Sequence, residues 1–312
     1  MKIFFAFIFL FLSFYNLAAQ DSLNNSSPSD NRFNKNKFLI VGGTSVAVYA
    51  TSLLALKKTW YKNFPKTSFH TFNDAGEWLQ MDKVGHAWSV YNLSGLSTAA
   101  WKWTGLSEKK SVVLGSITGF SYLTVIEILD AHSKNWGWSW ADMTANIAGS
   151  SLFATQQLLW QEQKIQFKFS AHRKKYEPEL EIRANELFGQ SLAERILKDY
   201  NGQTLWLSFN VNSFLHKKNI PAWLNLSVGF GAEGMFGGYK NIAYDKNGNV
   251  SFNRSDIKRY RQWYLSPDVD FTKIKTNSKF VRTILAGLNT IKIPAPALEF
   301  SNGKIKGHWF YF

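Results

Sequence analysis

The chain has 312 residues, of which 45% are hydrophobic and 19% are charged, a composition typical of a folded protein. It contains no cysteine, which excludes disulfide scaffolds, thiolate zinc sites, cysteine nucleophiles and a lipid-modified cysteine anchor. Its 36 lysines and arginines outnumber its 22 aspartates and glutamates, so the protein is strongly basic.

Residues 1–20 predict a secretory signal peptide. An apolar run from Ile3 to Leu12 is too short to span a bilayer and is followed by small residues. We expect cleavage after Ala19 or Gln20, with retention as a membrane anchor as the alternative. Residues 21–36 are rich in Asn, Ser and Asp and predict a flexible leader. The mature protein is therefore expected in the periplasm or at the outer membrane.

The basic excess lies mainly in the second half of the chain. Residues 161–312 carry 23 basic and 13 acidic side chains, against 12 and 9 in residues 21–160. A basic surface attracts polyanions, and an exported chain meets anionic lipid headgroups first. We therefore expect membrane lipid or another envelope polyanion as partner, with an envelope protein as a further partner, and no nucleic acid. An uncommitted, solvated basic surface is the alternative.

Residues 37–161 predict a helical module of four segments. Residues 38–56 contain no charge and form the best transmembrane candidate of the mature chain, although the glycines at 42 and 43 equally suit a helix packed against neighbours. The other segments are Met81–Trp103, Ser111–Ala131 and Trp140–Trp160. Their small residues permit close approach of backbones, so the four segments predict one cluster. Composition leaves open whether lipid or water surrounds it.

Residues 162–312 change to short runs with a period of two, which predicts strands. The runs are Ile165–Phe169, Thr204–Val211, Trp223–Val228, Arg261–Leu265, Asp268–Phe271 and Lys304–Phe312. Turn signals at residues 201–202, 246–249 and 302–303 separate several of them. Two amphipathic stretches, Asn185–Lys198 and Lys279–Leu288, predict helices within this basic, aromatic region.

The last run ends at the aromatic residue Phe312. The closing strand of outer-membrane barrels resembles it in being a terminal aromatic strand. A full barrel needs about eight strands or more, and only six to eight runs are present. We therefore expect an open sheet or partial barrel with its apolar face on the membrane or on the helices. The predicted fold class is α+β, with about four small-residue-rich helices before a mainly antiparallel β region.

One group of polar residues stands out, because ionisable side chains in such helices are costly to bury without partners. The group consists of Asp82, Lys83, His86, Glu127, Asp130, Asp142 and Asn146. Asp82 and His86 are four positions apart, Glu127 and Asp130 three, and Asp142 and Asn146 four, so each pair shares one face of its helix. We expect three helices to bring these faces together.

Two interpretations of this group stay open. In the first, His86 is positioned by Asp82 or Asp142 as a general base or ligand, with Glu127 and Asp130 as acid–base partner or cation site. In the second, which we favour, the group is a buried network that clamps the helices or binds a partner. One histidine with several carboxylates suits a harder cation than zinc, and whether any metal binds stays undecided.

The same residues resemble a known family. Between about residues 80 and 150, the pattern Asp82-Lys83-x-x-His86, Glu127-x-x-Asp130 and Trp136-Gly137-x-Ser139-x-x-Asp142-x-x-x-Asn146-x-x-Gly149 is similar to YfiM-type predicted periplasmic lipoproteins, a domain of unknown function. It is more distantly similar to VanZ-like membrane proteins. The C-terminal half resembles longer, Bacteroidetes-type members. The resemblance implies an envelope location and no particular reaction, and the lack of cysteine departs from the lipoprotein label.

No cofactor is expected. Residues 229–234 fit the dinucleotide fingerprint G-x-G-x-x-G, but residues 235–240 do not open a helix, so a glycine-kinked strand or loop is favoured. We therefore expect an exported cell-envelope protein of unknown activity, membrane-associated, with a structural or partner- or lipid-binding role. The alternative is an envelope hydrolase or transferase that acts on a lipid-linked or phosphorylated substrate through His86 and its neighbouring carboxylates.

Overall fold

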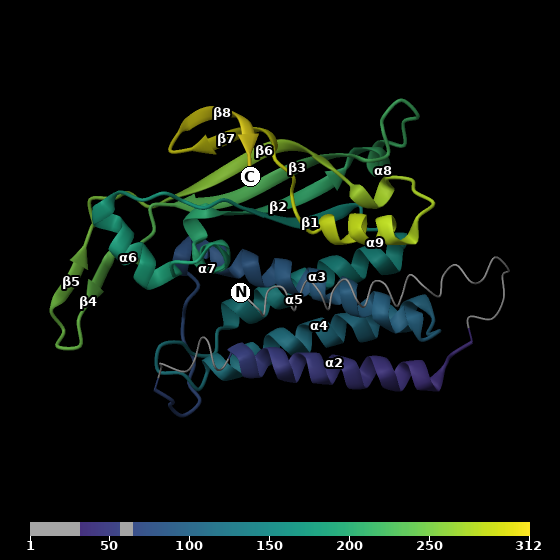
Figure 1. Ribbon diagram of the computed structural model, residues 1–312, viewed down its shortest axis with the longest axis horizontal. Coiled ribbons are helices and arrows are strands. Elements are labelled where there is room, and N and C mark those ends of the chain that lie inside the picture. Colours follow the sequence, from purple (N-terminus) through teal and green to yellow (C-terminus); the bar gives the residue numbers. More distant parts are fainter. Residues whose placement is uncertain (1–31, 57–64) are drawn as a thin grey trace.

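The computed structural model describes residues 32–56 and 65–312 and places a layer of helices against one side of a curved sheet (Figure 1). The helices come mainly from the N-terminal half and the strands from the C-terminal half. This arrangement confirms the predicted α+β class with an open, antiparallel sheet. The predicted signal peptide and most of the predicted leader lie outside the described residues.

The helical layer consists of α2 (Lys35–Leu56), α3 (Met81–Trp103), α4 (Glu108–Asp130) and α5 (Trp140–Trp160). The predicted close packing through small residues is confirmed for α3, α4 and α5. A Cβ atom added at Gly149 would lie 2.1 Å from the carbonyl oxygen of Ala87, and one added at Gly115 would lie 2.1 Å from Oγ1 of Thr98. Glycine is therefore required where these helices touch.

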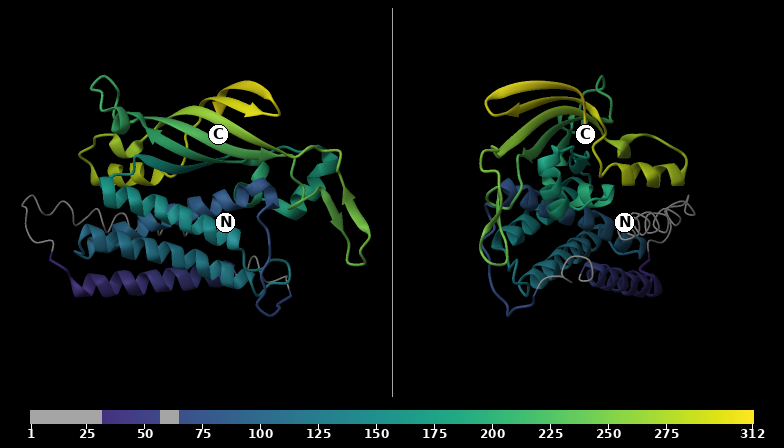
Figure 2. Two further views of the ribbon diagram at one scale, coloured as in Figure 1. Left: turned by 180° about the vertical axis from the view of Figure 1, so that it is seen from behind. Right: turned by 60° about the vertical axis from the view of Figure 1, so that its left-hand side comes forward.

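The main sheet has the strand order β1-β2-β3-β6-β7-β8, and every neighbouring pair is antiparallel. Its strands are β1 (Ile165–Ala171), β2 (Gln203–Asn210), β3 (Leu224–Glu233), β6 (Tyr260–Val269), β7 (Ala295–Ser301) and β8 (Lys304–Tyr311). A separate hairpin of β4 (Ile242–Tyr244) and β5 (Val250–Asn253) extends beyond one end of the sheet (Figure 2). Around the sheet lie α6 (Pro178–Phe188), α7 (Leu192–Lys198), α8 (Val211–Leu215), α9 (Lys279–Leu288) and the 3₁₀ turns η2 (Glu77–Gln80), η3 (Tyr200–Gly202) and η4 (Phe271–Lys273).

Two predicted elements needed correction. The predicted helix Asn185–Lys198 is two helices, α6 and α7, because Gly189 adopts a left-handed φ of 79° between them. The predicted runs Arg261–Leu265 and Asp268–Phe271 form one strand, β6, which ends at Val269. Pro267 is tolerated in it because β6 pairs with β7 only over residues 262–265, so the missing N–H leaves no gap in that ladder.

The two faces of the main sheet differ in polarity. The apolar residues Leu205, Phe230, Trp263, Phe300 and Ile305 are paired in one row across β2, β3, β6, β7 and β8. On β1 and β2 this face packs against α3 and α5. Further along the sheet the helices no longer cover it, and Trp263 is 51% exposed and Ile305 is 69% exposed.

The opposite face of the sheet is buried and mainly polar, apart from an aromatic cluster of Trp206, Tyr264 and Tyr311. The row from β2 to β6 contains Ser208, Ser227 and Ser266, and all three side chains are buried. The segment before β7 also bonds to the outer edge of β1, because Phe169 donates to the carbonyl oxygen of Thr290 and accepts from the amide of Lys292. The sheet stays open, but it curls around its polar side.

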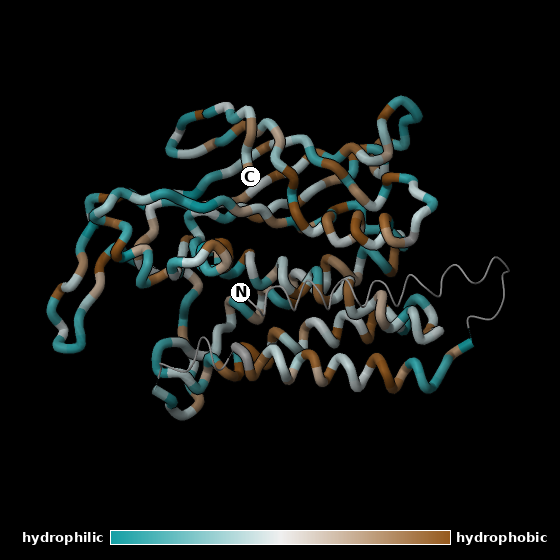
Figure 3. Tube along the Cα trace, viewed as in Figure 1, coloured by the Kyte–Doolittle hydropathy of each residue, from teal (hydrophilic) through white to brown (hydrophobic). Residues whose placement is uncertain are grey.

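Two helices are long and apolar enough to cross a membrane by length and composition. One covers Lys35–Leu54 in α2, of which 11% is buried, and the other is α4, of which 39% is buried. Hydrophobic stretches recur along α2 on the side of the molecule away from the sheet (Figure 3). Soluble core helices pass the same test, so both alternatives for the α2 segment remain open.

Candidate functional site

The predicted polar residues gather at one end of the helical layer, where α3 and α5 begin and α4 ends. Asp82, Lys83 and His86 occupy the first turns of α3, and Glu127 occupies the last turn of α4. Asp142 stands in the first turn of α5, where its backbone amide donates to the N-cap Ser139 at 3.0 Å. The N-terminal ends of α3 and α5 favour negative charge, which helps to place carboxylates there.

Lys83 is the central cation of the cluster. Its Nζ lies 2.5 Å from Oδ2 of Asp74, 2.9 Å from Oδ2 of Asp82 and 2.8 Å from Oδ1 of Asp142. Lys83, Asp74 and Asp142 are buried. One ammonium group thus holds carboxylates from a loop, from α3 and from α5 together.

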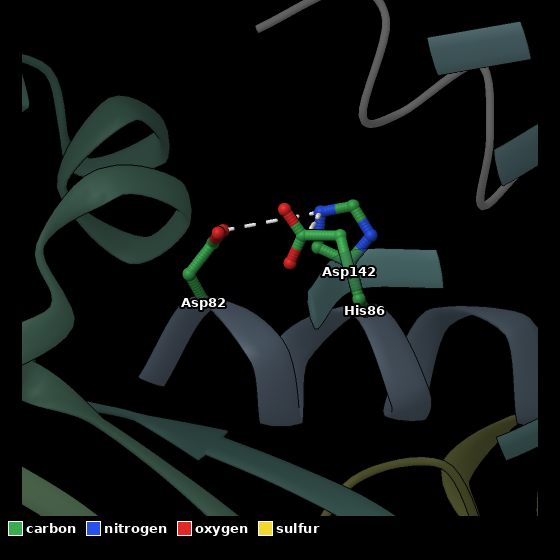
Figure 4. A group of neighbouring side chains, drawn as sticks. All are labelled: Asp82, His86 and Asp142. Carbon is green, nitrogen blue, oxygen red and sulfur yellow. Dashed lines mark ion pairs between the residues drawn. The ribbon is translucent and has the colours of Figure 1, made fainter. Parts of the chain in front are cut away.

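His86 lies between two further sets of acceptors, of which the set formed by Asp82 and Asp142 is drawn in Figure 4. Its Nδ1 is 3.3 Å from Oδ1 of Asn146 and 3.7 Å from Oε1 of Glu127. Its Nε2 is 4.0 Å from Oδ1 of Asp82 and 4.0 Å from Oδ1 of Asp142. Both edges of the imidazole ring therefore face oxygen atoms that accept protons or cations.

Burial raises the pKa of several acids in the cluster. It raises the pKa of Glu127 to about 8 and that of Asp142 to about 6, and the pKa of nearby Glu77 to about 7. Burial lowers the pKa of His86, but the neighbouring carboxylates outweigh it and the net shift is upward. Burial raises the pKa of Asp82, but the charges of His86 and Lys83 outweigh it and lower the pKa. Burial is thus the main cause of the raised pKa values of Glu77, Glu127 and Asp142.

Residues 71–158 match the model of a family described as predicted periplasmic lipoprotein (DUF2279). The matched range contains all seven residues of the predicted polar group, and it supports an exported, periplasmic protein of unknown function. No curated protein and no solved structure matches the chain. The closer resemblance to YfiM-type, Bacteroidetes-type and VanZ-like proteins stays a prediction.

Asp130 takes a different place from the other six residues of the predicted polar group. The hydrogen bonds and ion pairs given above link those six. Asp130 is the last residue of α4, and its charge acts on the cluster by raising the pKa of Glu127.

Three residues of the cluster were not predicted from the sequence. Asp74 lies in the loop before α3 and accepts a hydrogen bond from Oγ of Ser139 at 2.5 Å. Tyr200 in η3 donates to Oδ1 of Asp82 at 2.8 Å across 118 positions of the chain. Glu77 in η2 lies close enough for the charges of Asp74 and Asp82 to raise its pKa. Loop and turn residues have no periodic pattern, so no local signal could have placed them at the helix ends.

Proposed function

We propose that this protein is a membrane-associated envelope protein whose main sheet contacts lipid through its exposed apolar face. The inverted polarity of the sheet carries this proposal. An antiparallel sheet with one solvated face normally turns polar side chains to water and apolar ones to the core. A sheet whose exposed face is apolar and whose buried face is polar is typical of strands that face lipid.

The size of the exposed face supports lipid rather than water as its surroundings. Besides the row through Trp263 and Ile305, a second row pairs Val228, Leu265 and Leu298, and all three side chains are exposed. Monomeric soluble proteins seldom expose contiguous apolar surface of this kind.

The edge strand β8 adds aromatic residues to this face and basic residues to the other. Trp309 is 87% exposed, and Phe310 follows it near the end of the chain. Lys304 and Lys306 are exposed on the opposite face of the same strand, where they pair with Ser301 and Glu299. Aromatic rings favour the membrane interface and lysines attract anionic headgroups, so β8 suits the boundary between lipid and water.

Vesicle flotation tests the proposal. The purified full chain should float with vesicles made of phosphatidylethanolamine and phosphatidylglycerol. Leu298→Glu places a charge on the apolar face and should weaken partitioning about tenfold, equivalent to ~1.4 kcal/mol. Ile182→Glu is the matched control, because Ile182 is also apolar and exposed but lies on α6.

Circular dichroism first checks that the wild type and both variants are folded. Failure of the folded wild-type chain to float would contradict the proposal. Equal flotation of Leu298→Glu and wild type would also contradict it. Saturable binding of the apolar face to a purified envelope protein in place of vesicles would assign the surface to a protein partner instead.

A second candidate function is hydrolysis or group transfer on a lipid-linked or phosphorylated substrate, with His86 as base. The observation that favours it is the position of the His86 imidazole, whose side chain is 16% exposed while carboxylates surround it. His86→Ala separates this function from a structural clamp. An enzyme should lose turnover of phosphate- or ester-linked lipid substrates and keep its melting temperature, whereas a clamp should lose about 1–3 kcal/mol of stability.

A further inference from the structure

Three ligand-type atoms from two helices converge beside the Lys83 cluster. They are Oδ1 of Asp82, Nε2 of His86 and Oδ1 of Asp142, and suitable atoms of these residues all lie within 4.8 Å of one another (Figure 4). The gap between Nε2 of His86 and each carboxylate oxygen is 4.0 Å, which is too long for a hydrogen bond. The three groups face one another without bonding directly.

The surroundings of His86 decide which of its nitrogens is available. Nδ1 faces the oxygens of Asn146 and Glu127, an arrangement that favours a proton on this nitrogen. In the neutral ring, Nε2 then presents its lone pair to the oxygens of Asp82 and Asp142. Lone pairs from three sides repel one another unless a proton or a metal cation lies between them. Metal-binding histidines have this arrangement, with the second nitrogen donating to an oxygen acceptor.

One buried carboxyl oxygen points to the same need. Oε1 of Glu127 has no hydrogen-bond partner, and Glu127 is 1% exposed. Oε1 of Glu127 lies 3.7 Å from Nδ1 of His86. A buried acceptor without a donor is costly, and a nearby cation removes that cost.

We propose that Asp82, His86 and Asp142 bind a divalent transition-metal cation that accepts mixed nitrogen and oxygen ligands, such as Mn²⁺ or Zn²⁺. Metal–ligand bonds of about 2.1 Å separate neighbouring ligand atoms by roughly 3 to 4 Å. The two separations of 4.0 Å from Nε2 of His86, and the limit of 4.8 Å for the whole group, therefore require inward shifts of roughly 0.5 to 1 Å. The site goes beyond lipid contact, since the sheet face takes no part in it.

Lys83 and Tyr200 position the ligands in this site. Lys83 contacts Asp82 through Oδ2, which leaves Oδ1 directed toward His86. Tyr200 donates to that Oδ1 at 2.8 Å, which fixes the carboxylate while leaving it a second lone pair. Because the Lys83 ammonium already offsets part of the negative charge, the site favours a cation that binds through histidine as well as through carboxylates.

Titration calorimetry and electron paramagnetic resonance test the site on the purified full chain after treatment with a chelator. One Mn²⁺ or Zn²⁺ ion should bind per chain, and bound Mn²⁺ should show coupling to one imidazole nitrogen. His86→Ala should abolish that coupling and weaken binding by at least about tenfold. Asp82→Asn, at a partly exposed position and of the same shape, should weaken binding to a similar degree.

His216→Asn is the matched control. His216 is exposed in a left-handed conformation that asparagine accepts, and it lies at the end of α8. This variant should bind like the wild type. The proposal fails if neither ion binds saturably below about 1 mM, or if Asp82→Asn and His86→Ala bind as the control does. Should His86→Ala not fold, Asp82→Asn and the nitrogen coupling in the wild type decide the matter.

Discussion

Lys168 on β1 and Asp268 on β6 form an ion pair of 2.9 Å in which both side chains are fully buried, although β2 and β3 lie between these strands. Such a contact is possible only because the sheet curls around its polar face. Lys168 also donates to the carbonyl oxygen of Val269 at 2.7 Å, and Ser208 donates to Asp268 at 2.6 Å. The pair therefore holds the curvature that turns the apolar face outward.

Lys168→Met should destabilise the protein by about 3–5 kcal/mol, because Asp268 would remain buried without its counter-charge. Denaturant unfolding monitored by tryptophan fluorescence measures the change. Lys246→Met, at an exposed turn position, should change stability by less than about 0.5 kcal/mol. Equal stability of the two variants would show that the ion pair does not hold the sheet.

Gly149→Ala should cost about 1–3 kcal/mol, because the new Cβ would lie 2.1 Å from the carbonyl oxygen of Ala87 and force α3 and α5 apart. Gly85→Ala is the matched control in α3, since a Cβ there meets nothing within 4 Å. It should stabilise the helix by about 0.5–1 kcal/mol. Thermal unfolding compares the two, and a stabilised Gly149→Ala variant would refute close packing at this position.

Lys292 makes stability depend on pH. Burial lowers its pKa to about 8, with Asp268 opposing the shift and Lys168 adding to it, whereas an unfolded lysine titrates near 10.5. Between these two values the unfolded chain binds more protons, so Lys292 makes stability rise with pH by up to about 1.4 kcal/mol per unit. Below about pH 8, Lys292 is charged in both states, and the full free-energy cost of burying its charge lowers the stability of the folded protein.

Lys292→Met should remove this contribution. The variant should gain stability over the wild type at pH 7, and the gain should shrink as the pH approaches 10. Unfolding at several pH values measures the difference, in which the other titrating groups cancel. A difference that does not change with pH would mean that Lys292 titrates normally in the folded protein.

Lys83→Met should destabilise the protein by about 3–5 kcal/mol, because Asp74, Asp82 and Asp142 would lose the ammonium that holds them. Lys110→Met, at an exposed position on α4, should have almost no effect. Chemical denaturation again gives the comparison. A Lys83→Met variant as stable as Lys110→Met would show that the carboxylates are balanced by other means.

The elements were predicted well because their signals are local. Residues 81–103 and 140–160 were predicted as helices with the bounds of α3 and α5. The strand β7 was missed because residues 293–296 contain two prolines, which locally oppose a strand. Gly189 likewise divides a continuous amphipathic pattern by its backbone conformation, which the pattern does not record.

The site was predicted in part for the same reason. Helical spacing placed Asp82 with His86 and Asp142 with Asn146 on shared faces, and the structure joins these faces at one end of the helical layer. Tyr200 reaches Asp82 from 118 positions away, and such a contact depends on how the sheet region packs against α3.

The sequence by itself determined where helices and strands lie, because periods of 3.6 and 2 follow from the backbone geometry of each segment. An alternating strand such as β3 shows that its two faces differ, but it does not show which face is enclosed. Only the tertiary structure decided that Asn225 and Ser227 turn inward while Leu226 and Val228 turn outward. That choice depends on contacts between distant segments, above all the Lys168–Asp268 pair that curls the sheet around its polar side.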